Sequence, residues 1–216
     1  WIVEKLGGAE HTIRWSLNPE YHHCTCNSII CKGGGPHVWD GDEDPLVKAL
    51  DALSQGKSVA MSAGTTTGKT YVLGACATLC FLACYPNSIV ISLATREVQL
   101  LLNMWKEIGT LWPRFRAMFP DARLMSGKLR MRDGEGEQEV WAATALSAGV
   151  GADEEFAQRL KGSHQQYMLW IVEEMAGVEQ PKIDTIIKTA TGKFNPILGM
   201  GQPESLHDPL TSFSRR

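Results

Sequence analysis

The sequence of 216 residues lacks a long apolar run and lacks a strong excess of either charge. Its longest apolar stretch, residues 71–84, is shorter than the ~20 residues that a transmembrane helix needs. We therefore expect a buried helix there, no contact with a membrane and no signal peptide. The formal net charge of −3 excludes a general electrostatic attraction to nucleic acid. Any DNA contact then requires a local basic patch or a ring of subunits.

The cysteines lack the C-x2-C spacing that is typical of zinc knuckles. Cys24, Cys26, Cys31 and His37 instead follow the spacing C-x-C-x4-C-x5-H. Zinc binding, a redox or disulfide role, and an ordinary reduced loop all remain open for this group. Cys76, Cys80 and Cys84 recur every four residues, which predicts small apolar fillers on one helical face.

Residues 1–45 lack sustained hydrophobic periodicity and end in a turn-rich segment. They predict an irregular N-terminal arm or small subdomain, which would carry the possible zinc site, followed by one domain over residues 46–216. The chain begins at Trp1 rather than at methionine, so we expect it to be part of a longer protein.

Regular alternation of strands and helices begins at Leu46. The predicted strands are residues 58–63, 88–94, 167–174 and 196–201, and the predicted helices start near residues 46, 69, 98 and 181. One helical stripe consists of Val98, Leu101, Leu102, Trp105 and Ile108. Residues 127–144 predict an inserted hairpin whose Lys128, Arg130 and Arg132 alternate with apolar residues and could touch DNA phosphates. Apolar strands alternating with helices predict a mostly parallel sheet with helices on both faces.

The segment "SAGTTTGKT" lacks the first glycine of the phosphate-loop pattern G-x-x-x-x-G-K-[ST]. Ala63 stands at that position, and its methyl group is tolerable if its φ is negative. The segment still connects a predicted strand to a predicted helix, where free N–H groups and the helix dipole favour phosphate. We therefore predict an α/β P-loop NTPase fold of the RecA/ASCE-like type. The predicted ATP-binding residues of this Walker A loop are Ala63, Gly64, Thr65, Thr66, Thr67, Gly68, Lys69 and Thr70.

Two carboxylates follow the apolar strand "MLWIV", as expected for a Walker B motif. Lys69 is expected to reach the β- and γ-phosphates, and Thr70 and Glu173 are expected to hold Mg²⁺. Glu174 is then placed to polarise the attacking water. These residues predict a Mg²⁺-dependent ATP hydrolase.

Four segments in order resemble the ATPase domain of the large terminase subunit, the DNA-packaging motor of tailed bacteriophages and related viruses. They are "SAGTTTGKT", "LATREVQLLLNMWKEI", "RLKGSHQQYMLWIVEEMAGV" and "PILGMGQP". The sequence departs from the family at Glu173, where most members have Asp, and at Gln202, where Asn is usual. The Pro of an Ala-Pro-Thr-like turn is also absent before Glu97.

This resemblance implies ATP-driven translocation of double-stranded viral DNA into a procapsid in the host cell cytoplasm. It implies self-association into a ring on the portal and contact with a small terminase subunit. It also implies that an arginine is supplied to the neighbouring subunit's ATP, for which Arg159 lies in the matching turn and Arg130 and Arg132 are the next candidates; a solvated surface arginine is the alternative for Arg159. Gln202 is expected to report the γ-phosphate state. Full-length members carry a C-terminal nuclease, for which this chain has no room.

Two alternative interpretations remain. A helicase-like DNA translocase would share the nucleotide site, although it would need a second RecA-like lobe. A zinc-stapled interaction module with a degenerate ATPase fold would explain the departures at Ala63, Glu173 and Gln202.

Overall fold

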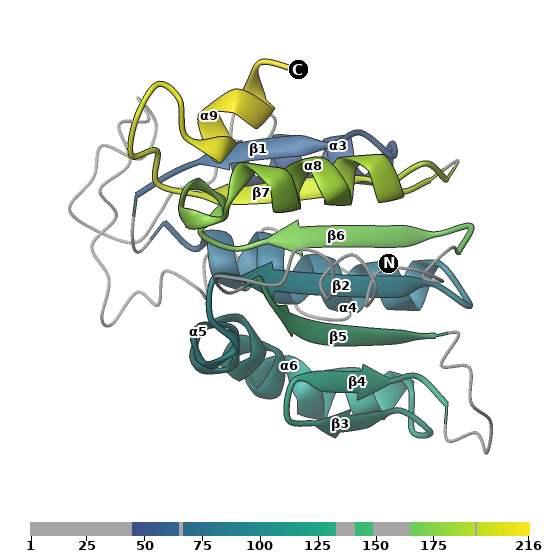
Figure 1. Ribbon diagram of the computed structural model, residues 1–216. Coiled ribbons are helices and arrows are strands. Elements are labelled where there is room, and N and C mark those ends of the chain that lie inside the picture. The colour runs from purple at the N-terminus through teal and green to yellow at the C-terminus, as the bar shows by residue number, and fades with distance from the viewer. Residues whose placement is uncertain (1–44, 65–66, 133–140, 149–164, 193) are drawn as a thin grey trace, which may run out of the picture.

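The computed structural model describes residues 45–64, 67–132, 141–148, 165–192 and 194–216. This part of the chain contains a sheet of seven strands in the order β1-β7-β6-β2-β5-β4-β3. The strands are β1 (Val59–Ser62), β2 (Ile89–Ala94), β3 (Arg123–Met125), β4 (Lys128–Arg130), β5 (Ala142–Ser147), β6 (Met168–Val172) and β7 (Ile197–Gly201). The strands from β1 to β5 in this order are mutually parallel, and β4 joins the sheet antiparallel to both of its neighbours. Figure 1 shows the strands one above another.

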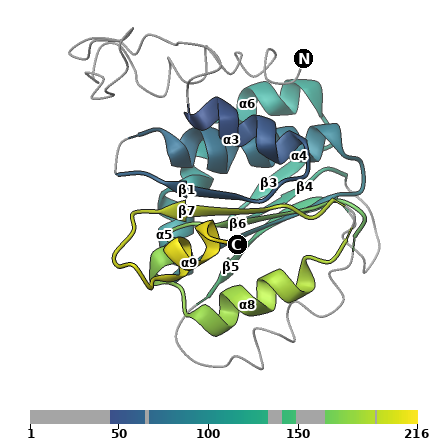
Figure 2. The same cartoon turned by 90° about the horizontal axis from the view of Figure 1, so that it is seen from above.

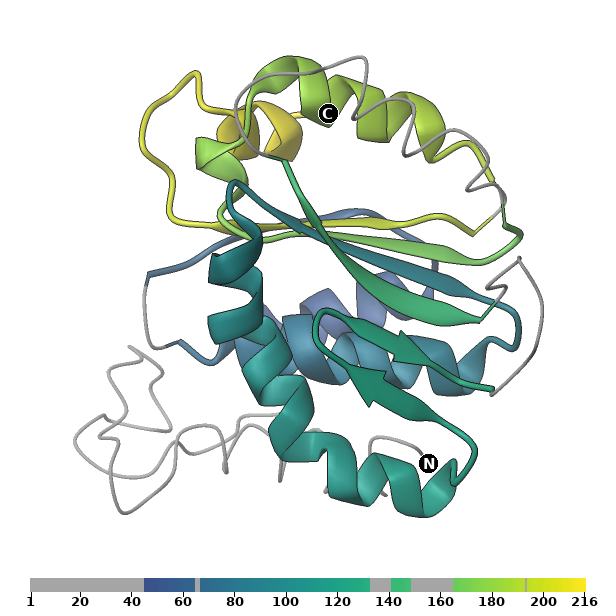
Figure 3. The same ribbon diagram turned by 60° about the horizontal axis from the view of Figure 1, so that its bottom comes forward.

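Helices cover both faces of the sheet, as Figures 2 and 3 show. One face carries α3 (Pro45–Ser54), the π-helix η2 (Thr70–Cys76), α4 (Ala77–Cys84) and α6 (Met104–Met118). The other carries α8 (Gln180–Thr189) and α9 (Pro209–Ser214), with the 3₁₀ helix η3 (Met175–Gly177) beside them. The core is accordingly divided into two clusters, one on each side of the sheet. Both faces of the strands are buried, which explains why β2, β6 and β7 read as continuous apolar runs.

The predicted helical stripe around residue 100 is partly wrong. Val98 and Leu102 are 63% and 67% exposed, whereas Leu100 is fully buried. The reason is a helix break at Asn103 (φ −103°, ψ −88°), which separates α5 (Glu97–Leu102) from α6. The break changes the rotational phase, so that α5 and α6 do not share one continuous apolar face.

The predicted hairpin is present as the antiparallel pair β4–β5. Leu129 and Met131 are buried, Lys128 and Arg130 are half-buried, and the guanidinium of the exposed Arg132 lies 5.5 Å from the centre of the Trp141 ring. The hairpin is not an insertion, however, because β5 also pairs in parallel with β2. The sequence-based prediction missed β5 as a strand of the main sheet, and it missed β3.

The helical cysteines are only partly in the core. Cys76 is buried, Cys80 is half-buried and Cys84 is exposed, because the segment begins as a π-helix and ends at the molecular surface. Burial raises the pKa of the Cys80 thiol to about 12. This favours the uncharged filler role that was predicted for it.

Helix α5 provides a matched pair of leucines that tests the helix break. Replacing the buried Leu100 with alanine removes core contacts, and we expect it to lower the free energy of unfolding by about 2–5 kcal/mol. Leu102→Ala changes an exposed side chain, and we expect an effect within about 0.5 kcal/mol. Urea denaturation of both variants measures this. A larger loss in Leu102→Ala than in Leu100→Ala would instead support the continuous apolar stripe that the sequence predicted.

Candidate functional site

The carboxyl ends of β1, β7 and β6 meet at one edge of the sheet, and the predicted site residues follow these three ends. Ser62 pairs with Gly201, and Val172 pairs with Gly199. Strand β7 therefore lies between the strand before the predicted phosphate loop and the strand before the two glutamates. Such an edge of a parallel sheet is where α/β proteins bind ligands.

The predicted phosphate loop leaves β1 and enters η2. Ala63 donates its backbone N–H to the Gly201 carbonyl at 3.0 Å, which ties the loop's first residue to β7. The φ of Ala63 is not positive, since Asn87 and Glu174 are the described non-glycine residues with positive φ. The condition set in the sequence analysis is therefore met, and the loop tolerates the methyl group of Ala63. Gly68 has φ +79°, a value that favours glycine at the sharp entry into the helix.

Lys69 is 6% exposed, and its side chain turns back into the loop. Its Nζ donates to the Gly64 carbonyl at 2.9 Å, and the Thr67 hydroxyl donates to the same oxygen at 3.2 Å. The ammonium group is thus held inside the loop at the start of η2. Thr65 and Thr66 lie outside the described residues.

Glu173 is a buried carboxylate at the end of β6, with 2% of its surface exposed. Its backbone N–H donates to the Leu93 carbonyl of β2 at 2.7 Å, which fixes its place. Its Oε2 is buried without a hydrogen-bond partner among the described residues. A buried carboxylate oxygen without a partner is costly, so it indicates a position kept for a ligand or a proton.

Electrostatics shows that Glu173 lies close to the other predicted residues. Burial, with a smaller effect of the neighbouring negative charge of Glu174, raises the pKa of Glu173 from 4.5 to about 7. The rise would be larger without the hydrogen bond to the Thr70 side chain and the positive charge of Lys69, which both act to lower the pKa. Lys69, Thr70, Glu173 and Glu174 are therefore close enough to act on one another.

Glu174 turns the chain sharply out of β6. It adopts the left-handed conformation with φ 50° and ψ 47°, and it is the residue before η3. Its side chain is half-buried, unlike that of Glu173. The two neighbouring carboxylates thus have different surroundings, which allows them different roles.

Gln202 is exposed and directly follows β7 at the same edge. It lies between the chain segments that carry the predicted phosphate loop and the two glutamates. The other predicted residues cannot be placed: Arg159 lies outside the described residues, and so do Cys24, Cys26, Cys31 and His37. Within the described ranges, no three His, Cys, Asp or Glu side chains gather into a group that could hold a metal ion.

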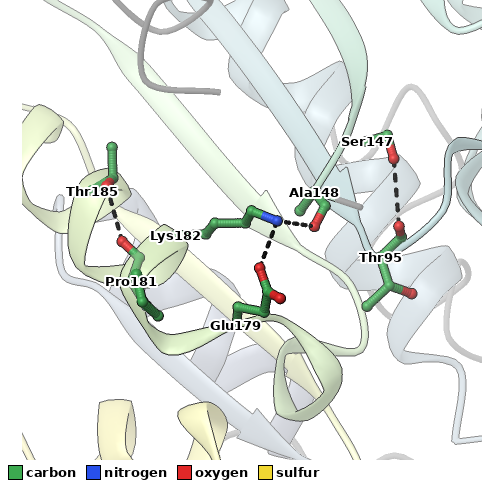
Figure 4. A network of polar contacts seen from close by, with 7 residues as sticks. All are labelled: Thr95, Ser147, Ala148, Glu179, Pro181, Lys182 and Thr185. Carbon is green, nitrogen blue, oxygen red and sulfur yellow. Dashed lines mark hydrogen bonds and ion pairs between the residues drawn. The ribbon is translucent and has the colours of Figure 1, made fainter. Parts of the chain in front are cut away.

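Figure 4 shows a polar network beside the site that the sequence analysis did not predict. Lys182 is 1% exposed, and its Nζ donates to the Ala148 carbonyl at 3.1 Å and lies 2.7 Å from Glu179 Oε2. The Ser147 hydroxyl donates to the Thr95 carbonyl at 3.4 Å. These contacts fasten α8 to the end of β5, and the end of β5 to the end of β2. A lysine in the helix after two glutamates gives no sequence signal of burial.

The fold defines the class: an α/β protein with a mostly parallel sheet that helices cover on both faces, similar to the fold of a solved large terminase. The predicted fold class is therefore confirmed. Among the described residues, none of the helices combines the length and the apolar character that crossing a membrane requires.

Comparison with known proteins confirms the predicted resemblance to large terminase subunits. No family model matches the chain. It is 28% identical over 175 residues to the probable terminase large subunit of Enterobacteria phage P7, which covers 79% of this chain and 33% of that protein. A large terminase from a thermophilic bacteriophage has a similar structure, with a TM-score of 0.59, 8% identity, and coverage of 78% of this chain and 41% of that chain.

A weaker structural likeness is to the large terminase ATPase domain of Thermus phage P74-26. Its TM-score is 0.47 and its identity 17%, over 71% of this chain and 64% of that one. The chain thus spans about a third of the curated relative, and 41% of the solved terminase from the thermophilic phage.

The raised pKa of Glu173 predicts a pH-dependent stability. Below about pH 4.5 the group is protonated in the folded and the unfolded chain alike. Between 4.5 and about 7 the folded chain keeps a proton that the unfolded chain has lost, so the free energy of unfolding falls as the pH rises.

Glu173→Gln removes this titration, and wild type serves as the reference. In the absence of nucleotide and metal, we expect the free energy of unfolding of wild type to fall by about 3 kcal/mol relative to that of the variant between pH 4 and pH 8. Urea denaturation across this range measures the difference. A difference that stays constant with pH would contradict a raised pKa at Glu173.

Proposed function

We propose that this chain is the ATPase part of a large terminase subunit, which couples ATP hydrolysis to translocation of double-stranded viral DNA into a procapsid. The observation that carries the proposal is the convergence of Lys69 and Thr70 with the buried Glu173 at one edge of the sheet. The similarity to terminase large subunits supports the same function.

The predicted phosphate loop binds ATP through the backbone of residues 63–70 and through Lys69. Lys69 already lies against the loop, and it exchanges its bond to the Gly64 carbonyl for the β- and γ-phosphate oxygens. The φ of Gly68 turns the chain so that the first N–H groups of η2 face the phosphates.

Thr70 and Glu173 offer the oxygen donors that Mg²⁺ prefers, and the buried Oε2 of Glu173 has no described hydrogen-bond partner. When bound, Mg²⁺ supplies charge neutralisation between the phosphates. Glu173, being one methylene longer than aspartate, reaches farther from β6 than the usual family residue. Glu174, which is less buried, accepts the proton of the attacking water.

Two further residues complete the proposed cycle. Gln202 follows β7 beside both halves of the site, and it responds to the γ-phosphate with its amide group. Arg159 neutralises charge on the γ-phosphate of a neighbouring subunit in a ring. The partners that we propose are double-stranded DNA, the portal and a small terminase subunit, in the host cell cytoplasm.

The role of Glu174 is tested by Glu174→Gln, which keeps the shape of the side chain but removes the base. We expect ATP binding to persist and turnover to fall by about 10²-fold or more. Steady-state ATPase assays and nucleotide titration measure the two quantities. Asp121→Asn, which removes an exposed carboxylate in the turn after α6, is the matched control and keeps full turnover. Undiminished turnover in Glu174→Gln would exclude Glu174 as the base.

The donated arginine is tested by assembly and complementation. In wild type we expect the ATPase rate per chain to rise with protein concentration. In Arg159→Ala we expect this rate to stay about 10³-fold below that of wild type, which is the smallest effect typical of the loss of an arginine finger. Mixing Arg159→Ala with Glu174→Gln restores part of the rate, because each variant supplies what its neighbour lacks. Arg116→Ala, at an exposed position of α6, is the control. A mixture as inactive as its components would contradict donation between subunits.

A further inference from the structure

The turn that carries Glu174 rests directly on two glycines of β7. A Cβ atom added to Gly201 would lie 3.3 Å from both Glu174 Cα and Met175 N. One added to Gly199 would lie 2.5 Å from Met175 Sδ and 2.7 Å from its Cε. Residues two apart on a strand point to the same face of the sheet. Strand β7 therefore lacks a side chain at both positions where the turn touches it.

Gly201 also holds the other half of the site. Its carbonyl accepts the N–H of Ala63, the first residue of the predicted phosphate loop, at 3.0 Å. One residue of β7 thus contacts the start of the loop through its carbonyl and the Glu174 turn through its bare Cα. The φ of Gly199 and of Gly201 is not positive, so close packing, rather than backbone conformation, requires glycine here.

The conformation of Glu174 needs this support. A left-handed backbone at a residue other than glycine costs about 1–3 kcal/mol and persists only where the surroundings impose it. Met175 supplies the anchor: its side chain is fully buried beside Gly199. A Cβ atom at Gly199 would also lie 3.4 Å from Phe213 of α9, so this space is closed on that side as well.

We propose that Gly199 and Gly201 are positioning residues that set the Glu174 carboxylate relative to the phosphate loop. The inference rests on the proposed function, since it assigns Glu174 the role of the base. Because both glycines lack a side chain, the turn packs directly against β7. The hydrogen bond from Ala63 to Gly201 holds the loop to the same strand. A shift of the turn by a few tenths of an ångström moves the carboxylate while the loop keeps its place.

The test is Gly201→Ala and Gly199→Ala, each assayed at the protein concentration where the wild-type rate per chain has reached its plateau. We expect the Kd for ATP to change less than about 3-fold and kcat to fall by about 10-fold or more, as expected for a misplaced catalytic group. Gly109→Ala is the matched control: a Cβ atom there meets nothing within 4 Å, and both constants stay unchanged.

A compensating change separates positioning from general damage. Met175→Val lacks the Sδ and Cε atoms that an added Cβ at Gly199 would meet, so we expect the double variant Gly199→Ala with Met175→Val to recover kcat several-fold over Gly199→Ala alone. Recovery supports the proposal. A kcat of Gly199→Ala equal to that of wild type overturns it. We expect this variant to fold, because the contacts under 3 Å of its added Cβ are with the flexible end of Met175, and Phe213 lies at the ordinary contact distance of 3.4 Å.

The two proposals fail differently. Wild-type chain that binds ATP but does not hydrolyse it at any concentration overturns the proposed function, and the positioning role with it. Hydrolysis by wild type together with an unaltered kcat in Gly199→Ala and Gly201→Ala overturns the positioning role alone.

Discussion

The burial of the Glu173 carboxylate is the constraint on which the rest of the site depends. A charged carboxylate in a buried position is unfavourable unless a cation or a hydrogen bond compensates it. Here Lys69 and Thr70 give partial compensation, while burial and Glu174 oppose it, and the balance leaves the pKa near 7. A group poised in this way responds strongly to the arrival of any positive charge. The order of the strands brings the loop with Lys69 and Thr70 and the turn at Glu174 to this carboxylate.

The strand order makes this arrangement possible. Because β7 separates β1 from β6, the loop and the glutamates leave the sheet on opposite sides of one strand. The same separation requires an element that touches both sides. Gly201 does so, because it accepts a bond from Ala63 and packs against the backbone of Glu174.

Much of this could be predicted from the sequence, because the signals are local. The strands β1, β2, β6 and β7 are apolar runs, and the loop motif places Lys69 and Thr70 without any knowledge of the fold. Strand β5 was missed because its sequence "AATALS" is rich in alanine, which has little preference for strands. The break at Asn103 was missed because the apolar residues on either side of it match a single helical period.

The properties of the site that come from packing had no sequence signal. The burial of Lys182 depends on where α8 meets the end of β5, and the left-handed backbone of Glu174 depends on its contact with β7. The glycines of "ILGMG" could be read as part of a strand, but their purpose is visible only once Met175 is seen against them.

In the described sheet, β1 has one neighbouring strand, because it stands at the end of the order. All of its inter-strand ladder bonds are therefore formed with β7. Local opening of that single ladder would release the strand before the predicted phosphate loop without disturbing the centre of the sheet. Amide hydrogens of β1 should then exchange with solvent sooner than those of β2 and β6, and their protection would report directly on how firmly the loop is held.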